Sequence, residues 1–145
     1  MIKIFGNNTL HTIILAAGEG KRLKPLTQDK PKGLISLFGK SLLQHQLDVY
    51  DSCNINDVSI VTGYKKDMIK FSNTFSFHNL NYQNTNMLET LFCAQEKIID
   101  AVIVAYGDII FEKKILEALL EEEEDISVVV DSNWKKYWDV RFENP

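Results

Sequence analysis

The sequence has few of the features that mark secreted, membrane-spanning or nucleic-acid-binding proteins. It contains two cysteines, Cys53 and Cys93, which have no metal-binding spacing and are too few for a disulfide framework. No apolar run approaches the roughly 18 residues of a membrane span, and the first residues do not have the pattern of a secretory signal. A net charge of −4 argues against broad nucleic-acid binding. We therefore expect a cytoplasmic protein that neither inserts into a membrane nor binds nucleic acid.

The three histidines, His11, His45 and His78, are far apart in the chain and have no Ser or Cys partner nearby, so we assign them no catalytic role. No internal repeat or low-complexity linker interrupts the sequence. With 145 residues, 45% of them hydrophobic and 25% charged, the chain is long enough for one ordinary core. We expect a single domain over residues 1–145.

The most informative stretch is an apolar run that ends in two glycines. Residues 13–17 are aliphatic, as in a strand buried on both faces, and Gly18 and Gly20 follow. Glycine permits a positive φ and a close approach of a ligand to the main chain. A glycine turn surrounded by cations suits a polyphosphate. The cations that follow are Lys21, Arg22, Lys24, Lys30 and Lys32.

Two common phosphate motifs do not explain this loop. Gly39-Lys40-Ser41 imitates the end of a Walker loop, but Gly33 lies six residues before Gly39, where the motif requires five. The third glycine of a dinucleotide-binding fingerprint is missing as well. A solvated basic surface loop remains the alternative to phosphate binding.

The hydrophobic pattern predicts an α/β fold with an open, mostly parallel twisted sheet and helices on both faces. Residues 2–10 read as a leader into the first strand, and no helix is expected after Val130. We expect strands at 12–17, 57–62, 75–80, 101–106 and 126–130, and helices at 41–53, 65–71, 87–97 and 112–124.

Polar residues and glycines follow several of these strands. Such sheets bind ligands beyond the carboxyl ends of their strands, so the loop at Gly18, Gly63-Tyr64 and Gly107-Asp108 should meet at one crevice. A carboxylate beside a phosphate site suits Mg²⁺. Asp108 is therefore a candidate metal ligand, although aspartate also closes turns and caps helices.

Residues 81–91 are rich in amides just before a predicted helix. Thr85 or Asn86 could simply cap that helix. Alternatively, the exposed amides and the helix N-terminus could recognise an acceptor or its phosphate.

The loop and the residues after it resemble a long signature of the nucleotidyltransferases that activate sugar phosphates and phospho-alcohols with an NTP. The matching segments are residues 15–23, LAAGEGKRL, and residues 30–34, KPKGL. The resemblance implies that Arg22 meets the triphosphate, that Lys32 lies at the reacting α-phosphate, and that Asp108 holds the metal, Mg²⁺. It also implies nucleotide binding by Leu15, Ala16, Ala17, Gly18, Glu19, Gly20, Lys21, Gly63 and Gly107.

The amide-rich segment resembles the Thr-Asn segment of phosphocholine cytidylyltransferases, with Met87 where many members have a second Asn. Thr85 and Asn86 are thereby implied in acceptor binding. The aromatic tail, with Trp134, Tyr137 and Trp138, could form a cage for a choline-like cation, although plain packing is favoured. Arg141 could instead meet an anionic acceptor. The combination of Tyr106-Gly107-Asp108 with this tail most resembles the branch that uses phosphoglutamine or a similar small phosphate.

These observations predict a Rossmann-like cytidylyltransferase that uses CTP, Mg²⁺ and a small phosphorylated acceptor, with a role in surface polysaccharide biosynthesis. A sugar-1-phosphate uridylyl- or thymidylyltransferase, or an NTP-sensing module without catalysis, are the alternatives. Family members continue well beyond such a length. We therefore expect an N-terminal part of a longer chain, which alone would bind nucleotide and turn over slowly. The base, the acceptor, the second metal carboxylate and the oligomeric state, with a dimer as one option, stay open.

Overall fold

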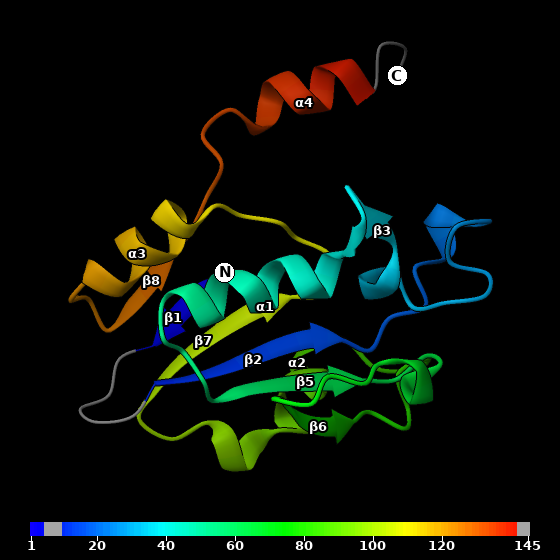
Figure 1. Ribbon diagram of the computed structural model, residues 1–145, viewed down its shortest axis with the longest axis horizontal. Coiled ribbons are helices and arrows are strands. Elements are labelled where there is room, and N and C mark those ends of the chain that lie inside the picture. The colour runs from blue at the N-terminus through cyan, green and yellow to red at the C-terminus, as the bar shows by residue number, and fades with distance from the viewer. Residues whose placement is uncertain (5–9, 142–145) are drawn as a thin grey trace.

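The fold is built on a six-stranded sheet. The structure is a computed structural model, and it describes residues 1–4 and 10–141 (Figure 1). The order of the strands across the sheet is β6-β5-β2-β7-β1-β8. Their bounds are β1 (Ile2–Ile4), β2 (Leu10–Ala16), β5 (Val58–Thr62), β6 (Phe75–His78), β7 (Ala101–Tyr106) and β8 (Ile126–Val128).

The sheet is mostly parallel, as the pattern predicted. Strand β2 pairs in parallel with both β5 and β7, and β5 pairs in parallel with β6. Strand β1 is the exception, because it lies antiparallel between β7 and β8. The prediction that residues 2–10 are only a leader is therefore wrong for β1. Its Lys3 is buried, and its Nζ donates hydrogen bonds to the carbonyls of Leu120 and Glu122 at the end of α3 (Lys113–Glu121).

Adjacent residues of β2 point to opposite faces of the sheet and enter two separate cores. Ile14 packs in a cluster with Leu43 and Tyr50 of α1 (Leu42–Ser52) and with Leu116 of α3 (Lys113–Glu121). Ile13 belongs to a second cluster, which includes Ala94 just after α2 (Met87–Phe92). Helices therefore cover both faces, and Figure 1 shows α1 in front of the sheet and α2 behind it.

The helices differ from the sequence prediction in their ends, and the helix expected over 65–71 is wrong, because only the 3₁₀ turn η3 forms there. Ser41 caps α1 as expected, and its hydroxyl accepts a hydrogen bond from the Gln44 amide at 3.1 Å. The helix predicted over 87–97 ends at Phe92, and a single 3₁₀ turn, η4, follows. A helix that was not predicted, α4, lies after β8 (Figure 1). The remaining elements are α4 (Trp134–Arg141), η1 (Lys21–Leu23), η2 (Lys32–Leu34), η3 (Lys66–Met68), η4 (Gln95–Lys97), β3 (Ser36–Leu37) and β4 (Lys40–Ser41).

Within residues 1–4 and 10–141, no helix combines the length and the apolar character that a membrane crossing would require.

Candidate functional site

Three parallel strands end at one edge of the sheet, and the chain turns sharply after each. The Gly107 amide after β7 donates to the Leu15 carbonyl at 2.9 Å, and the Tyr64 amide after β5 donates to the Ala17 carbonyl at 2.9 Å. These bonds join the turns side by side. A cavity of about 390 Å³ opens at this edge. The predicted site residues that line it are Leu15, Ala16, Ala17, Gly18, Gly20, Arg22, Lys32, Thr85, Asn86, Gly107 and Asp108.

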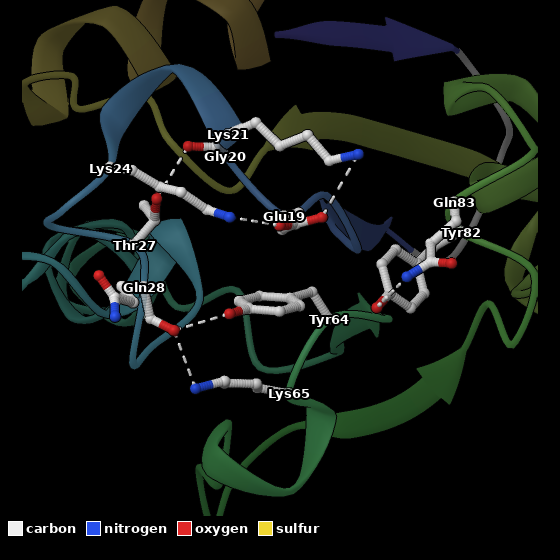
Figure 2. A network of polar contacts seen from close by, with 10 residues as sticks. All are labelled: Glu19, Gly20, Lys21, Lys24, Thr27, Gln28, Tyr64, Lys65, Tyr82 and Gln83. Carbon is white, nitrogen blue, oxygen red and sulfur yellow. Dashed lines mark hydrogen bonds and ion pairs between the residues drawn. The ribbon is translucent and has the colours of Figure 1, made fainter.

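The glycine loop has the backbone geometry for which glycine is needed. Gly20 lies in the left-handed region with φ of 66°, and η1 begins directly after it. The fully buried Thr27 fixes this turn, because its hydroxyl donates to the Gly20 carbonyl at 2.9 Å (Figure 2). A Cβ on Gly20 would lie only 3.1 Å from Cγ2 of Thr27. The loop is thus held in one shape, with Gly18 and Arg22 at the cavity.

Glu19 and Lys21, two of the predicted nucleotide-binding residues, do not line the cavity. Glu19 is paired instead with Lys24, at 3.1 Å, and with Lys21, at 3.6 Å (Figure 2). The hydrogen bond from Lys24, together with the charges of both lysines, lowers the pKa of the Glu19 carboxyl. Glu19 therefore offsets part of the positive charge next to the site, and it cannot itself attract a phosphate.

Gly63 is also absent from the cavity lining. It is a packing position, since a Cβ there would lie 2.7 Å from the Ala17 carbonyl oxygen and 2.8 Å from Tyr82. The following residues hold the phosphate loop from the side: the Tyr64 hydroxyl and Lys65 Nζ both donate to the Gln28 carbonyl, at 2.9 and 3.0 Å (Figure 2).

Lys32 and Asp108 come together although 76 positions separate them in the chain. Lys32 begins the 3₁₀ turn η2, and Asp108 lies two residues after the end of β7. Their side chains form an ion pair at the cavity and are 32% and 35% exposed. Both groups can therefore be reached by a ligand, and either can exchange its partner for a phosphate oxygen or a cation.

The donor set at Asp108 suits a cation that arrives together with a nucleotide. Among the residues that the structure describes, no cluster of three or more His, Cys, Asp or Glu side chains could form a closed metal site. Mg²⁺ commonly binds through one or two carboxylates and completes its shell with phosphate oxygens and water. One accessible carboxylate fits this pattern, and a cation bound there would take the place of the Lys32 ammonium group as the partner of Asp108.

The amide-rich segment contributes part of the cavity wall. Thr85 and Asn86 line it, and Asn86 also caps α2, since its side chain accepts from the amides of Leu88 and Glu89 at 2.9 and 3.2 Å. The capping role of Asn86 is confirmed, and its recognition of an acceptor stays a prediction. The first amides of this helix are occupied by their own cap, which argues against a free anion site there. Buried Asn79 supports the wall from behind by donating to the hydroxyl of Thr85 at 2.8 Å.

The aromatic tail does not contribute a described residue to the cavity. The rings of Trp134 and Trp138 meet edge to face, 6.3 Å apart, and Trp134, Tyr137 and Trp138 are 59%, 71% and 54% exposed. The expectation of plain packing is wrong for these side chains, and the three do not enclose a cage. The Arg141 side chain lies outside the described residues, so its predicted contact with an acceptor stays a prediction.

Sequence reasoning missed several wall residues. Gly33, Met87 and Tyr106 each lie next to a predicted residue in the chain, so a reading of the motifs with their flanks would have included them, whereas Tyr82 lies three residues before Thr85. Thr90 needs more, because only the turn of α2 brings it to the cavity. The missed residues are Gly33, Tyr82, Met87, Thr90 and Tyr106.

The chain is similar to a known protein family and to several of its relatives. The sequence profile of the family described as "MobA-like NTP transferase domain" matches residues 12–139. The chain is 35% identical to the CTP:phosphoglutamine cytidylyltransferase of Campylobacter jejuni over 94% of its own length and 58% of that protein. It is 29% identical to a UTP–glucose-1-phosphate uridylyltransferase of Haloferax volcanii over 80% of its own length and 50% of that protein.

The solved structure of the CTP:phosphocholine cytidylyltransferase from Streptococcus pneumoniae is similar as well. It matches with a TM-score of 0.63 and 30% identity over 70% of this chain and 46% of that one. The chain thus spans between about half and three fifths of the length of the two curated relatives named above, 50% and 58%.

Proposed function

The chain belongs to the MobA-like NTP transferase family of nucleotidyltransferases, as its motif predicted, and on this premise we propose that it is a cytidylyltransferase. It transfers CMP from CTP to a small phosphorylated acceptor, such as phosphoglutamine or a phosphocholine-like molecule, and releases pyrophosphate. The observation that carries the proposal is the meeting of Lys32 and Asp108 at a cavity that the Gly18–Gly20 loop also lines.

The reaction needs no nucleophile from the protein. An oxygen of the acceptor phosphate attacks the α-phosphorus of CTP, a new P–O bond forms, and the bond to the β-phosphate breaks, so that pyrophosphate leaves. Such a reaction is accelerated by alignment of the two substrates and by positive charge placed where negative charge develops.

The cavity residues divide these tasks between its walls. Main-chain groups from Leu15 to Gly18 hold the nucleotide, and Arg22 stabilises the leaving pyrophosphate. Lys32 exchanges its ion pair with Asp108 for an oxygen of the α-phosphate. Thr85 and Asn86, which also line the cavity, would bind the acceptor.

Asp108 is the residue that would hold Mg²⁺, with the phosphate oxygens of the nucleotide as further ligands. When bound, Mg²⁺ neutralises part of the phosphate charge. Asp108 contributes by staying accessible at the cavity beside Lys32, so that the cation it would hold and the Lys32 ammonium group would act on the same phosphates.

The preference for CTP rests on the likeness to two cytidylyltransferases, at 35% and 30% identity. A sugar-phosphate uridylyltransferase is similar at 29% identity, which keeps a UTP-dependent reaction as the second candidate. The two proposals differ in the base that the cavity accepts.

Calorimetric titration of CTP, UTP, GTP, ATP and dTTP, with and without Mg²⁺, tests the proposal. We expect CTP to bind more tightly than the other nucleotides and its binding to strengthen with Mg²⁺. Preference for UTP or dTTP would favour the sugar-phosphate reaction. Equal affinity for CTP with and without Mg²⁺ would contradict the proposed role of Asp108 as a metal ligand.

A further inference from the structure

Gln46 is a buried amide that the sequence motifs do not mark. It lies in α1 and is 1% exposed. It does not line the cavity, yet it faces the end of β7, where the turn to Asp108 begins. Burial of an amide is costly unless hydrogen bonds replace those it makes with water. We therefore expect the buried amide of Gln46 to have hydrogen-bond partners within the protein.

The partners of Gln46 are two carbonyls on either side of Gly107 and Asp108. Its Nε2 lies 2.9 Å from the carbonyl oxygen of Tyr106 and 2.9 Å from that of Ile109. A carbonyl can only accept, so both contacts require the NH₂ end of the amide, which has two protons to donate. One side chain thus bridges the first and last residues of the turn 106–109.

The same turn also contacts β2 and η2, and these contacts leave little room for the turn to move. The Gly107 amide donates to the Leu15 carbonyl at 2.9 Å, and a Cβ on Gly107 would lie 2.8 Å from the Cβ of Ala16. A Cβ on Gly33 would lie 3.1 Å from the Gly107 carbonyl oxygen. The backbone from which the Asp108 side chain extends is therefore fixed between β2, η2 and α1.

We propose that Gln46 is a positioning residue for the Asp108 carboxylate. By bonding both ends of the turn, it sets the direction from which Asp108 meets the divalent cation of the bound nucleotide, and this inference rests on the proposed function. Residues that orient a metal ligand without touching the metal commonly change metal affinity by roughly ten- to hundredfold when they are replaced.

Gln46→Met tests the proposal, because methionine has nearly the shape of glutamine and does not donate hydrogen bonds. The matched control is Gln44→Met, the same change two residues earlier in α1. The Gln44 side chain donates to Asp48 at 2.7 Å, away from the cavity. Gln46→Glu is a second variant of almost unchanged size, in which the two N–H donors are replaced by a carboxyl group that, even when protonated, donates to only one of the two carbonyls. If circular dichroism shows Gln46→Met to be unfolded, Gln46→Glu takes its place.

Two measurements are made on each protein. Hydrogen exchange follows the amides of residues 106–110, and Mn²⁺ titration with CTP present measures cation affinity without turnover. We expect both Gln46 variants to exchange faster in this turn and to bind Mn²⁺ about tenfold or more weakly. We expect Gln44→Met to match the unsubstituted protein in both measurements.

The result that would overturn the inference is faster exchange in the turn with unchanged Mn²⁺ affinity, since Gln46 would then serve stability alone. Equal effects of the Gln44 and Gln46 variants would overturn it too. Absence of Mn²⁺ binding by the unsubstituted protein with CTP would refute the proposed function, and the inference with it. The failure of the proposed function is therefore seen in the unsubstituted protein, and failure of the inference alone is seen in the variants.

Discussion

Replacement of Lys32 by alanine separates a catalytic role from a structural one. The Lys32–Asp108 ion pair is open to solvent, with side chains 32% and 35% exposed. Pairs of this kind stabilise a fold by about 0–1 kcal/mol, so Lys32→Ala should leave the free energy of unfolding nearly unchanged. A donor aimed at charge that develops in a transition state contributes much more, roughly 10²–10³ in rate.

We therefore expect Lys32→Ala to lower turnover by about two to three orders of magnitude, with a much smaller loss of CTP affinity. Pyrophosphate release measures turnover, calorimetry measures affinity, and urea unfolding measures stability. Lys40→Ala is the control, because Lys40 forms a similar surface ion pair, with Asp48, and does not line the cavity. An equal loss of affinity and turnover in Lys32→Ala, or equal slowing by Lys40→Ala, would refute the role of Lys32.

Three further predictions concern the packing of the site and the core. A Cβ on Gly18 would meet no atom within 4 Å, so Gly18→Ala should change the free energy of unfolding by less than about 0.5 kcal/mol. The added methyl group fills space next to the loop and should weaken CTP binding on the order of tenfold; full affinity in calorimetry would contradict this. Gly63→Ala would place a Cβ 2.7 Å from the Ala17 carbonyl oxygen and should cost about 1–3 kcal/mol in urea unfolding, whereas an unchanged midpoint would show that the turn can shift. Burial raises the pKa of the Tyr50 hydroxyl, so its share of stability is present below the ordinary tyrosine pKa and is lost as pH rises above about 10; Tyr50→Phe should lose less stability between pH 7 and pH 11 than the unsubstituted protein, and parallel losses would contradict this.

Local sequence was sufficient wherever a pattern is completed by neighbouring residues. The uninterrupted apolar run of β7 (Ala101–Tyr106) was predicted with both of its ends, and Ser41 was predicted as a cap of α1. The convergence of Gly18, Gly107 and Asp108 followed from one rule, that parallel strands end at one edge of the sheet.

Contacts between distant residues decided the parts that the sequence did not reveal. Strand β1 is only three residues long and includes a buried lysine, Lys3, whose partners are carbonyls at Leu120 and Glu122. The helix expected to reach Lys97 stops earlier, and Lys97 instead pairs with Asp57, at 2.9 Å, at the start of β5. Sequence patterns over a few neighbouring residues do not indicate pairings between such distant residues.

The residues of the site divide in the same way, into those that a local motif indicates and those that depend on distant contacts. The glycine loop, Lys32 and Asp108 were identified from motifs, whereas the pairing of Glu19 with lysines and the packing role of Gly63 depend on how Lys24 and Tyr82 are placed in space. Gln46 is one of several polar residues in α1, and only its two bonds to the turn 106–109 distinguish it.

The most direct test of the central claim is a transfer reaction analysed by mass spectrometry. The protein is incubated with Mg²⁺ and either CTP or UTP, together with phosphoglutamine, phosphocholine or glucose 1-phosphate, and the products are identified by mass. We expect a CDP-linked product from CTP and one of the first two acceptors, with pyrophosphate released in equal amount. A UDP-sugar from UTP and glucose 1-phosphate, with no CDP-linked product, would contradict it.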